Sequence, residues 1–304
     1  MKIVIAGGSG FLGRALSERL VADGHQVLVL TRGGGSGRPW EGPRSTATWT
    51  PNGAAGGWAS AIDGAHAVVN LAGTSIGDAR WTKSRKAEIL DSRVDATRSV
   101  VAAIPGLTNP PSVLVSASAQ GVYGDRGDEE LTEASGVGSG FLADVCRQWE
   151  AAALGAPAGV RVVLLRTGIA LAADGGALPR MVLPFKLFAG GPFGSGRQFM
   201  SWIHLDDWVG IARLALTDEG VRGPINLGSP NPVRNREFAA ALGRSLGRPR
   251  WIPTPGLALR MALGEMAQPL LLASTRMVPA AALSCGYRFV HTEIGPALET
   301  LLRT

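Results

Sequence analysis

The sequence predicts an α/β fold, in which a doubly wound Rossmann parallel sheet is joined to a smaller carboxy-terminal substrate lobe. Short β-branched runs bounded by glycine alternate with longer segments of helical period, which is typical of βαβ units around a buried parallel sheet. A glycine-rich loop connects the first apolar run to the first helical segment. With 304 residues, the chain is long enough for one large domain or two closely joined ones.

The predicted strands are short and apolar, and the predicted helices each carry an apolar face. The strands are Ile3–Ala6, Val27–Thr31, Ala67–Leu71, Val113–Ser116, Val162–Arg166 and Pro224–Gly228, with Thr46–Trp49 as a weaker candidate. The helices are Phe11–Asp23, Arg85–Ala103 and Phe141–Leu154. Gly24 directly follows the first helix, and glycine is favoured at that position because it accepts a left-handed backbone.

The glycine-rich loop matches the dinucleotide-binding pattern GxGxxG in the correct context, after an apolar strand and before an amphipathic helix. Its residues are Gly7, Gly8, Ser9, Gly10, Phe11, Leu12 and Gly13. The first glycines allow a tight turn and close approach to a pyrophosphate, and Gly13 allows the helix to pack tightly on the strand. The start of the helix supplies N–H groups and a positive dipole end, so we predict a phosphate site there. The alternative is a glycine-rich turn that binds nothing.

The end of the second strand predicts which dinucleotide is bound. In NAD-preferring sites an Asp or Glu at this place holds the ribose 2′-hydroxyl. Thr31 and Arg32 stand there in this sequence. A carboxylate would repel a 2′-phosphate, whereas Arg32 can pair with it and Thr31 can donate a hydrogen bond, so the predicted cofactor is NADP(H). The alternative is that Arg32 is a solvated loop arginine, and Arg38 is a weaker candidate for the same phosphate.

The pattern of elements changes after Ala170, where glycines punctuate a loop-rich segment. A strand-like stretch follows at Phe199–His204, and the tail from Arg236 is mostly helical. We therefore assign residues 1–174, completed by about 206–228, to an NADP-binding Rossmann domain, and residues 175–205 and 229–304 to the smaller substrate lobe. The stretch Gly33–Gly57 has the composition of a mobile flap.

Composition and charge exclude several functional classes. The chain has 30 basic and 24 acidic residues, and its arginines are scattered rather than clustered with aromatic residues, so we expect no nucleic-acid partner. Cys146 and Cys285 are far apart and form no metal-ligand pattern, so we predict neither a disulfide nor a metal site. No signal peptide is recognisable before the first strand, and charges and proline interrupt the apolar stretch Leu257–Ser274. We expect a cytoplasmic protein with a small-molecule substrate and no membrane partner, and a homodimer is compatible with the sequence.

Further motifs make the chain resemble extended short-chain dehydrogenases/reductases, the NAD(P)-dependent epimerase/dehydratase family. They are Asn70-Leu71-Ala72-Gly73, Ser116-Ala117-Ser118, Val122-Tyr123-Gly124-Asp125 and the run from Trp202 to Asp207. The stretch Phe141–Glu150 and the tail are similar to the "epimerase family protein" branch with its carboxy-terminal domain of unknown function. The resemblance covers essentially the whole chain.

The resemblance implies a serine and a Tyr-x-x-x-Lys motif as the catalytic groups, and the sequence departs from that motif. If Glu150 is aligned with the glutamate that usually follows it, Leu142 stands in the place of tyrosine and Cys146 in the place of lysine. A shift by one residue gives Phe141 and Val145. None of these side chains can move a proton to a carbonyl as tyrosine and lysine do.

Ser118 and Tyr123 are therefore the candidate catalytic residues. Ser118 matches the family's serine, which hydrogen-bonds the reacting oxygen. Tyr123 lies where family members carry a tyrosine near the substrate, and its phenol requires a positive neighbour to act as an acid or base at neutral pH. The alternative is that Tyr123 only lines the pocket.

The resemblance also implies cofactor contacts outside the phosphate loop. Glu88 and Arg93, on the helix beside the cofactor, match contacts to ribose and phosphate oxygens, although by pattern alone they could equally be solvated surface charge. The remaining expected contacts are Leu71, Ala72 and Gly73 on the adenine side and the loop from Arg166 to Ala170 on the nicotinamide side.

A run of polar residues at His204-x-Asp206-Asp207 has the residue types of an acid–base pair. The favoured interpretation is that Asp206 or Asp207 begins a helix whose apolar face runs from Trp208 to Ala215, as an N-cap that stabilises the helix by about 1 kcal/mol.

Two functional hypotheses follow from the sequence. The first is an NADP(H)-dependent oxidoreductase or epimerase-like enzyme that transfers hydride at a small carbonyl, imine or alkene, with a proton from Tyr123, Ser118 or water. The second is a noncatalytic NADP(H)-binding sensor or regulator, which the missing tyrosine and lysine favour.

Overall fold

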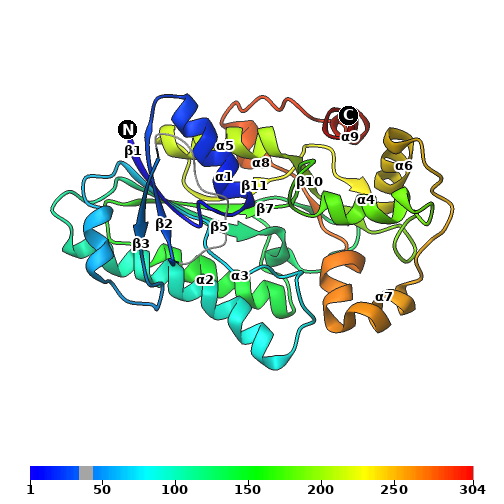
Figure 1. Cartoon of the computed structure of the whole chain (residues 1–304), viewed down its shortest axis with the longest axis horizontal. Helices are drawn as coiled ribbons and strands as arrows, with labels where there is room; N and C mark the ends of the chain where they lie inside the picture. Colours follow the sequence, from blue (N-terminus) through cyan, green and yellow to red (C-terminus); the bar gives the residue numbers. More distant parts are fainter. Residues whose placement is uncertain (34–43, 304) are drawn as a thin grey trace.

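The computed structural model describes residues 1–33 and 44–303 and contains the predicted doubly wound α/β sheet (Figure 1). The sheet strands are β1 (Lys2–Ala6), β2 (Gln26–Thr31), β3 (Arg44–Thr48), β4 (Ala67–Asn70), β5 (Val113–Ala119), β7 (Arg161–Thr167) and β11 (Gly223–Leu227). They pair in the order β11-β7-β5-β4-β1-β2-β3, and every pair is parallel. The predicted strands, including the weaker Thr46–Trp49 candidate, are all present with small changes at their ends.

Helices cover both faces of this sheet (Figure 1). Helices α1 (Phe11–Ala22) and α5 (Leu205–Thr217) lie on one face, and α2 (Lys83–Ala103) and α3 (Phe141–Leu154) lie on the other. Strand residues alternate between the two cores, so that Ile3 and Ile5 pack with α1 and α5 while Val4 packs with α2. The strands are buried on both faces, which explains why they read as continuous apolar runs.

The direction in which successive strands are added to the sheet reverses beside β1, although all of its strands are parallel. From β1 the chain proceeds outward through β2 to β3, then returns to β4 and proceeds to the other edge through β5, β7 and β11. The carboxyl ends of β1 and β4 diverge at this switch point, and ligands of doubly wound sheets bind in that crevice. The phosphate loop follows β1 at this edge, so the topology positions it for a nucleotide.

A second cluster of helices forms the carboxy-terminal lobe, on the right of Figure 1. Its helices are α4 (Leu178–Lys186), α6 (Asn235–Leu246), α7 (Gly256–Leu263) and α9 (Ile294–Leu302). Phe185, Trp202, Phe238 and Leu298 meet in its core. The remaining short elements are β6 (Glu130–Leu131), β8 (Ile169–Leu171), β9 (Phe199–Met200), β10 (Trp202–His204), β12 (Val233–Arg234), β13 (Arg276–Met277) and α8 (Ala280–Ser284).

The tail differs from the predicted division of the chain. Residues 229–304 were all expected in the lobe, but α8 packs against β11, and Ala282 is buried in the same core as α1 and α5. Tyr287 packs against that core as well. The predicted strand-like stretch Phe199–His204 is divided into β9 and β10 at Ser201, whose hydroxyl donates to the carbonyl of Thr275.

The predicted start of α5 is wrong in detail. His204, not Asp206 or Asp207, is the N-cap, and its Nδ1 accepts the Asp206 N–H at 3.1 Å. The buried Asp207 carboxylate instead accepts the N–H groups of Val290 and His291 at 2.8 and 2.9 Å. Asp207 thus anchors the tail to the Rossmann core.

Two further sequence predictions can be placed. Gly24 has φ +81° and follows α1, as expected for the glycine at a helix end. Arg38 and most of the glycine run after Gly33 lie outside the described residues. Among the described helices, none is both long and apolar enough to cross a bilayer.

Candidate functional site

The phosphate loop is held against the loop that follows β4. Gly7 has φ +78°, and a Cβ atom added there would lie 2.7 Å from the carbonyl carbon of Leu71 and 2.8 Å from the nitrogen of Ala72. A Cβ atom on Gly13 would overlap the carbonyl oxygen of Gly7. Only glycine permits both approaches, so the loop brings main-chain groups of Leu71 and Ala72 to the switch point.

The amino end of α1 is open to an anion. Gly10 is its N-cap and supplies no side-chain acceptor to the first turn. The Gly10 N–H donates to Gly7 at 3.0 Å, which closes the turn, and Arg14 donates to the carbonyl of Ser9 at 3.2 Å. The first-turn N–H groups of a helix have no partner within the helix, so this end can hold a phosphate.

Arg32 is exposed at the end of β2, where the sequence predicts a 2′-phosphate contact. No carboxylate of the described chain forms an ion pair with it. Glu88 lies close enough to feel its charge: hydrogen bonds from Arg85 at 2.7 Å and Thr74 at 3.1 Å lower the Glu88 pKa first, and Arg32 lowers it further. Thr74 is in the loop after β4, so Glu88 and Arg32 flank that loop.

Arg93 is a second cation without a counter-charge. Its Nη1 donates to the Ile89 carbonyl at 2.9 Å, and its guanidinium lies 5.2 Å from the centroid of Trp149. A Cβ atom on Gly73 would lie 3.1 Å from the Arg93 side chain. Burial lowers the pKa of Arg93, and no carboxylate within the described ranges pairs with it. A half-buried arginine in this state is suited to an anion that the chain itself does not supply.

Phe11 connects the phosphate loop to the segment after β8. A Cβ atom on Gly176 would lie 2.9 Å from the Phe11 ring and 2.9 Å from the carbonyl oxygen of Ala170, and a Cβ atom on Gly175 would overlap the same ring. The start of α1 and the residues after β8 are therefore neighbours. Leu12 packs against the buried core on the other side.

These groups fit a dinucleotide. The glycines form a cradle that any Cβ atom would fill, the start of α1 offers N–H groups to a pyrophosphate, and Arg32 and Arg93 offer positive charge on two sides of the loop after β4. All of them lie at the carboxyl edge of the parallel sheet.

Beside this crevice, a buried ion pair fixes the two candidate catalytic hydroxyls. The carboxylate of Glu150 accepts Nε and Nη2 of Arg166 at 2.9 and 2.8 Å. The Ser118 hydroxyl donates to the same carboxylate at 2.6 Å. Arg166 Nη1 donates at 3.0 Å to the Tyr123 hydroxyl, which donates to Asn226 at 2.7 Å.

This network defines the protonation of its members. Burial is the largest influence on Arg166 and lowers its pKa, but the hydrogen bonds and charge of Glu150 outweigh it, so the net pKa is raised and the guanidinium stays charged. Burial raises the pKa of Tyr123, and the nearby Arg166 charge offsets part of that increase. Tyr123 has no exposed surface and Ser118 is only 3% exposed, so both hydroxyls lie within the protein, bonded to protein partners.

Arg166 differs from its prediction. The sequence places it at the end of the predicted strand Val162–Arg166 and at the start of a loop that reaches the nicotinamide side. It lies within β7, as the strand prediction requires, but its guanidinium is engaged by Glu150, Tyr123 and the Glu133 carbonyl. Ala170 is in β8, next to Gly176 and Phe11. On the expected nicotinamide side, the predicted residue that lies beside the phosphate loop is thus Ala170 of β8 and not Arg166.

The positions aligned with tyrosine and lysine lie on α3 and carry no acid or base. Leu142 packs in an apolar cluster with Trp81, Phe141 and Met266 of the carboxy-terminal lobe. Cys146 is buried, and burial followed by the charge of Glu150 raises its pKa to about 11. The thiol therefore stays protonated at neutral pH and cannot replace a lysine cation.

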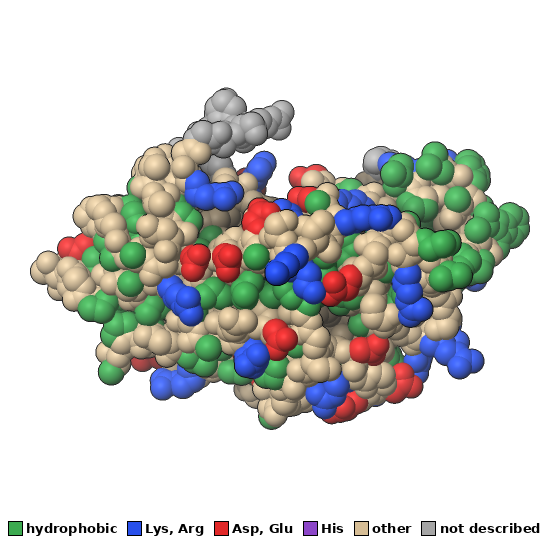
Figure 2. Space-filling view, turned by 90° about the horizontal axis from the view of Figure 1, so that it is seen from below, with side chains coloured by type: hydrophobic (Ala, Val, Ile, Leu, Met, Phe, Trp, Pro, Cys, Tyr) green, Lys and Arg blue, Asp and Glu red, His purple; other side chains and the backbone are tan. Residues whose placement is uncertain are grey.

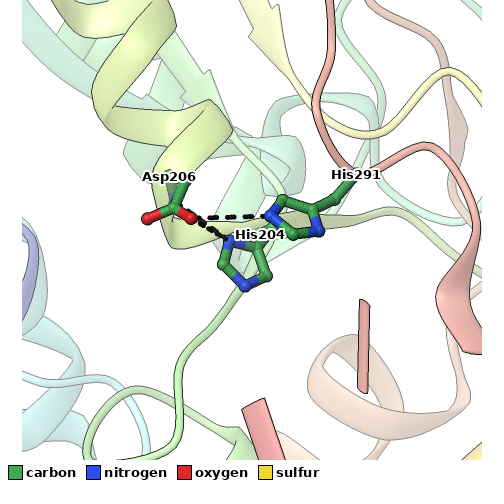
Figure 3. A group of neighbouring side chains, drawn as sticks. All are labelled: His204, Asp206 and His291. Atoms are coloured by element: carbon green, nitrogen blue, oxygen red, sulfur yellow. Dashed lines mark hydrogen bonds and ion pairs between the residues drawn. The ribbon is translucent and has the colours of Figure 1, made fainter. Parts of the chain in front are cut away.

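The acidic and histidine residues near α5 form a compact group (Figure 3). His204, Asp206 and His291 each bring one potential metal-ligand atom within 4.8 Å of the others. The two imidazole rings are stacked, with centroids 3.6 Å apart and planes 22° apart. Lone pairs in stacked rings run nearly parallel and do not converge on one ion, and His204 Nδ1 already accepts a hydrogen bond from the backbone. The geometry fits a tail contact better than a metal site.

Comparisons with known proteins agree with this geometry. A family model for the NAD dependent epimerase/dehydratase family matches residues 3–228. The chain belongs to this family. A second model, a domain of unknown function, matches residues 254–301, so the predicted carboxy-terminal resemblance is also confirmed.

Relatives in the family cover nearly the whole chain. It is 41% identical to "Epimerase family protein SDR39U1 homolog, chloroplastic" of Arabidopsis thaliana, over 100% of this chain and 87% of the relative. It is 38% identical to "Epimerase family protein YfhF" of Bacillus subtilis, over 99% of this chain and 98% of the relative. The crystal structure of human epimerase family protein SDR39U1 (isoform2) with NADPH has a TM-score of 0.90 at 34% identity and covers 100% of both chains.

Sequence reasoning missed the partners that fix the network. No structural role was predicted for Glu150, although it shares the buried face of α3 with Cys146 and Ala153. A charged residue on an apolar helical face is a signal for a buried partner, and Arg166 in an apolar strand is the matching signal. Asn226 and Trp149 carried no comparable pattern.

We predict that Glu150→Gln lowers the free energy of unfolding by about 3–5 kcal/mol, because it leaves the Arg166 cation buried without a counter-charge. Urea unfolding measures this change. The matched control is Asp144→Asn on the same helix, which removes an ion pair with Arg147 whose side chains are 60% and 62% exposed. We expect the control to cost less than about 1 kcal/mol. Equal effects of the two variants would contradict a structural role for the pair.

We predict that His204 makes the protein less stable in mild acid. Burial, followed by the charge of His291, lowers the His204 pKa in the folded state, while Asp206 and Asp207 partly raise it. The unfolded chain therefore takes up this proton first, so the stability is complete above about pH 6.5 and is lost as pH falls from there toward the lowered folded pKa. His204→Asn keeps an acceptor for the Asp206 N–H without titrating.

The measurement is urea unfolding of both proteins between about pH 7 and pH 5, where we expect the variant to lose less stability than the wild type. His66→Asn, outside the cluster, is the control. Identical pH profiles for wild type and His204→Asn would exclude this role.

Proposed function

We propose that this chain is an NADP(H)-dependent oxidoreductase or epimerase-like enzyme of the short-chain dehydrogenase/reductase type that acts on a small carbonyl, imine or alkene. The observation that carries the proposal is that Arg32 and Arg93, near the loop after β4, form no ion pair with a carboxylate of residues 1–33 or 44–303. When bound, the nicotinamide supplies the hydride chemistry, and the protein orients it.

The charges at the end of β2 support NADP(H) over NAD(H). A ribose 2′-phosphate needs positive charge, and Arg32 is exposed and lacks an ion-pair partner in the described chain. Thr31, directly before it, ends β2 and can add a hydrogen bond. The crystallised human relative carries NADPH, which is consistent with this preference for the chain studied.

The proton source is the unusual part of the proposal. Ser118 and Tyr123 remain candidates because of their family positions, but their hydroxyls donate to Glu150 and Asn226 inside the protein. A general acid must be within hydrogen-bonding reach of the reacting atom. Burial of both hydroxyls favours water as the proton donor, with Ser118 and Tyr123 as positioning residues behind the crevice wall.

A noncatalytic NADP(H)-binding sensor is the second candidate function. Its supporting observation is that the places of tyrosine and lysine hold Leu142 and Cys146, one in an apolar cluster and the other a protonated thiol. Such a protein would bind the nucleotide and pass its redox state to a partner. The broader proposal includes a cytoplasmic location, a small-molecule ligand and a homodimer.

We predict that Arg32→Ala weakens NADPH binding by about 10- to 100-fold and changes NADH binding by less than about twofold, because a charge-assisted contact to phosphate contributes about 1.5–3 kcal/mol. Calorimetric titration with both cofactors measures the effect. Arg303→Ala, which removes the same charge from α9, is the control. Unchanged discrimination between NADPH and NADH in Arg32→Ala would refute the assignment of Arg32.

We predict NADPH oxidation with at least one member of a panel of small aldehydes, ketones, imines and activated alkenes. The decrease in nicotinamide absorbance measures turnover, and the Gly13→Val variant, whose side chain would overlap Gly7, is the control for cofactor-dependent signal. Tight NADPH binding without turnover, together with a partner protein that binds in only one redox state, would overturn the enzyme proposal and support the sensor.

A further inference from the structure

The carboxy-terminal lobe exposes an unusual number of large apolar side chains. Twelve such residues are exposed in the described chain, and seven of them fall in two stretches of this lobe. They are Leu183, Leu187, Phe188, Trp251, Ile252, Leu257 and Met261. We call these seven residues the apolar patch. Trp251 is 76% exposed and Met261 67%, and a contiguous apolar surface of this kind marks an interaction site.

The two stretches of the patch lie side by side. The N–H of Ile252 donates to the carbonyl of Gly190, and the N–H of Thr254 donates to that of Pro192 at 2.9 Å. The guanidinium of Arg248 lies 4.5 Å from the centroid of Phe188. Figure 2 shows hydrophobic side chains gathered at one end of the molecule, with Lys and Arg side chains beside them. The patch is therefore built by the end of α4, the loop before α7 and α7 itself.

The backbone at Phe188 supports a role in binding. Phe188 is the one non-glycine residue with positive φ in the described chain, at 61°. L side chains rarely adopt this conformation, and such strain is typical of functional positions. Phe188 is 55% exposed and is not part of a buried core cluster, so core packing does not explain its placement.

Positive charge predominates in the two segments that carry the patch, and the acidic groups beside them, Asp78 and Glu265, are paired with Arg180 and Lys86. Residues 175–205 and 238–264 contain no Asp or Glu, whereas they contain Arg180, Lys186, Arg197, Arg244, Arg248, Arg250 and Arg260. These seven positive charges exceed the net charge of +6 of the whole chain. Asp78 pairs with Arg180, but no described carboxylate pairs with Lys186, Arg248 or Arg250. The partner of this surface must be both apolar and anionic.

We propose that the apolar patch docks the protein, without spanning, on the surface of a bilayer that contains anionic lipid. Exposed Trp, Phe and aliphatic side chains enter the interface between head groups and acyl chains, and a surrounding basic rim is attracted to anionic head groups. A second copy of the chain fits this surface less well, because a symmetric dimer through the patch would bring two sets of unpaired arginines together. The inference goes beyond the proposed function and does not depend on it.

The sequence predicts no membrane partner, because it contains no uninterrupted apolar stretch long enough to span a bilayer. The patch combines residues about 60 positions apart in the sequence, so it exists only in the folded chain. Its residues belong to segments that flank the lobe core.

The test is flotation of the full chain with phosphatidylcholine vesicles, with and without about one-third phosphatidylglycerol. We expect the protein to float with the anionic vesicles and remain unbound with the neutral ones. The double variant Trp251→Ser/Met261→Ser removes apolar surface, and Lys186→Gln/Arg250→Gln removes charge. Each should reduce the partition coefficient by at least about tenfold.

The matched apolar control is Val137→Ser/Val290→Ser, which changes exposed side chains outside the patch, and the charge control is Arg19→Gln/Arg147→Gln. Both controls should float like the wild type, and thermal unfolding with NADPH binding should verify that every variant is folded. Three results would overturn the proposal: no flotation of the wild type, equal binding to neutral vesicles, or a sedimentation change from dimer to monomer in Trp251→Ser/Met261→Ser. Binding to an acidic polypeptide but not to anionic vesicles would assign the surface to a protein partner instead.

Discussion

The buried ion pair between Glu150 and Arg166 is the constraint on which the rest of this site depends. Two charges in a medium of low dielectric constant are tolerated only when nearly every donor and acceptor is satisfied. Ser118 and Tyr123 supply the missing partners, and Asn226 extends the chain of bonds to the carbonyl of Val278 in the tail. The same bonds that hold α3 to β7 therefore fix both candidate hydroxyls, and they tie the tail to the Rossmann sheet.

The nucleotide crevice, unlike the ion-pair network, is formed largely by main-chain groups and by glycines that lack a Cβ atom. Gly7 and Gly13 remove the Cβ atoms that would separate α1 from the loop after β4. The charges enter at the edges, where Arg32 and Arg93 form no ion pair with any carboxylate in the part of the chain that the structure describes. A site with unpaired cations around an uncharged cradle is prepared for an anion, whereas the neighbouring network is already complete and has no need of one.

Features that are determined by a few neighbouring residues could be predicted from the sequence, whereas contacts between distant residues could not. The parallel strands, the phosphate loop and the glycine after α1 follow from patterns within a few residues, and the sheet confirms the fold class they predict. The partner of Arg166 lies 16 residues away on another element, and the anchor of His291 is Asp207, 84 residues away. No local pattern specifies such pairs, so the sequence predicted neither the pairing of Arg166 with Glu150 nor the histidine N-cap of α5. The apolar patch arises in the same non-local way.

Leu142 has a structural role on α3. Leu142 and Phe141 pack with Met266, Leu263 and Leu270, all from the region that the domain of unknown function covers. The carboxy-terminal domain and the apolar face of α3 therefore depend on each other. Leu142 thus contributes to the contact between the two lobes.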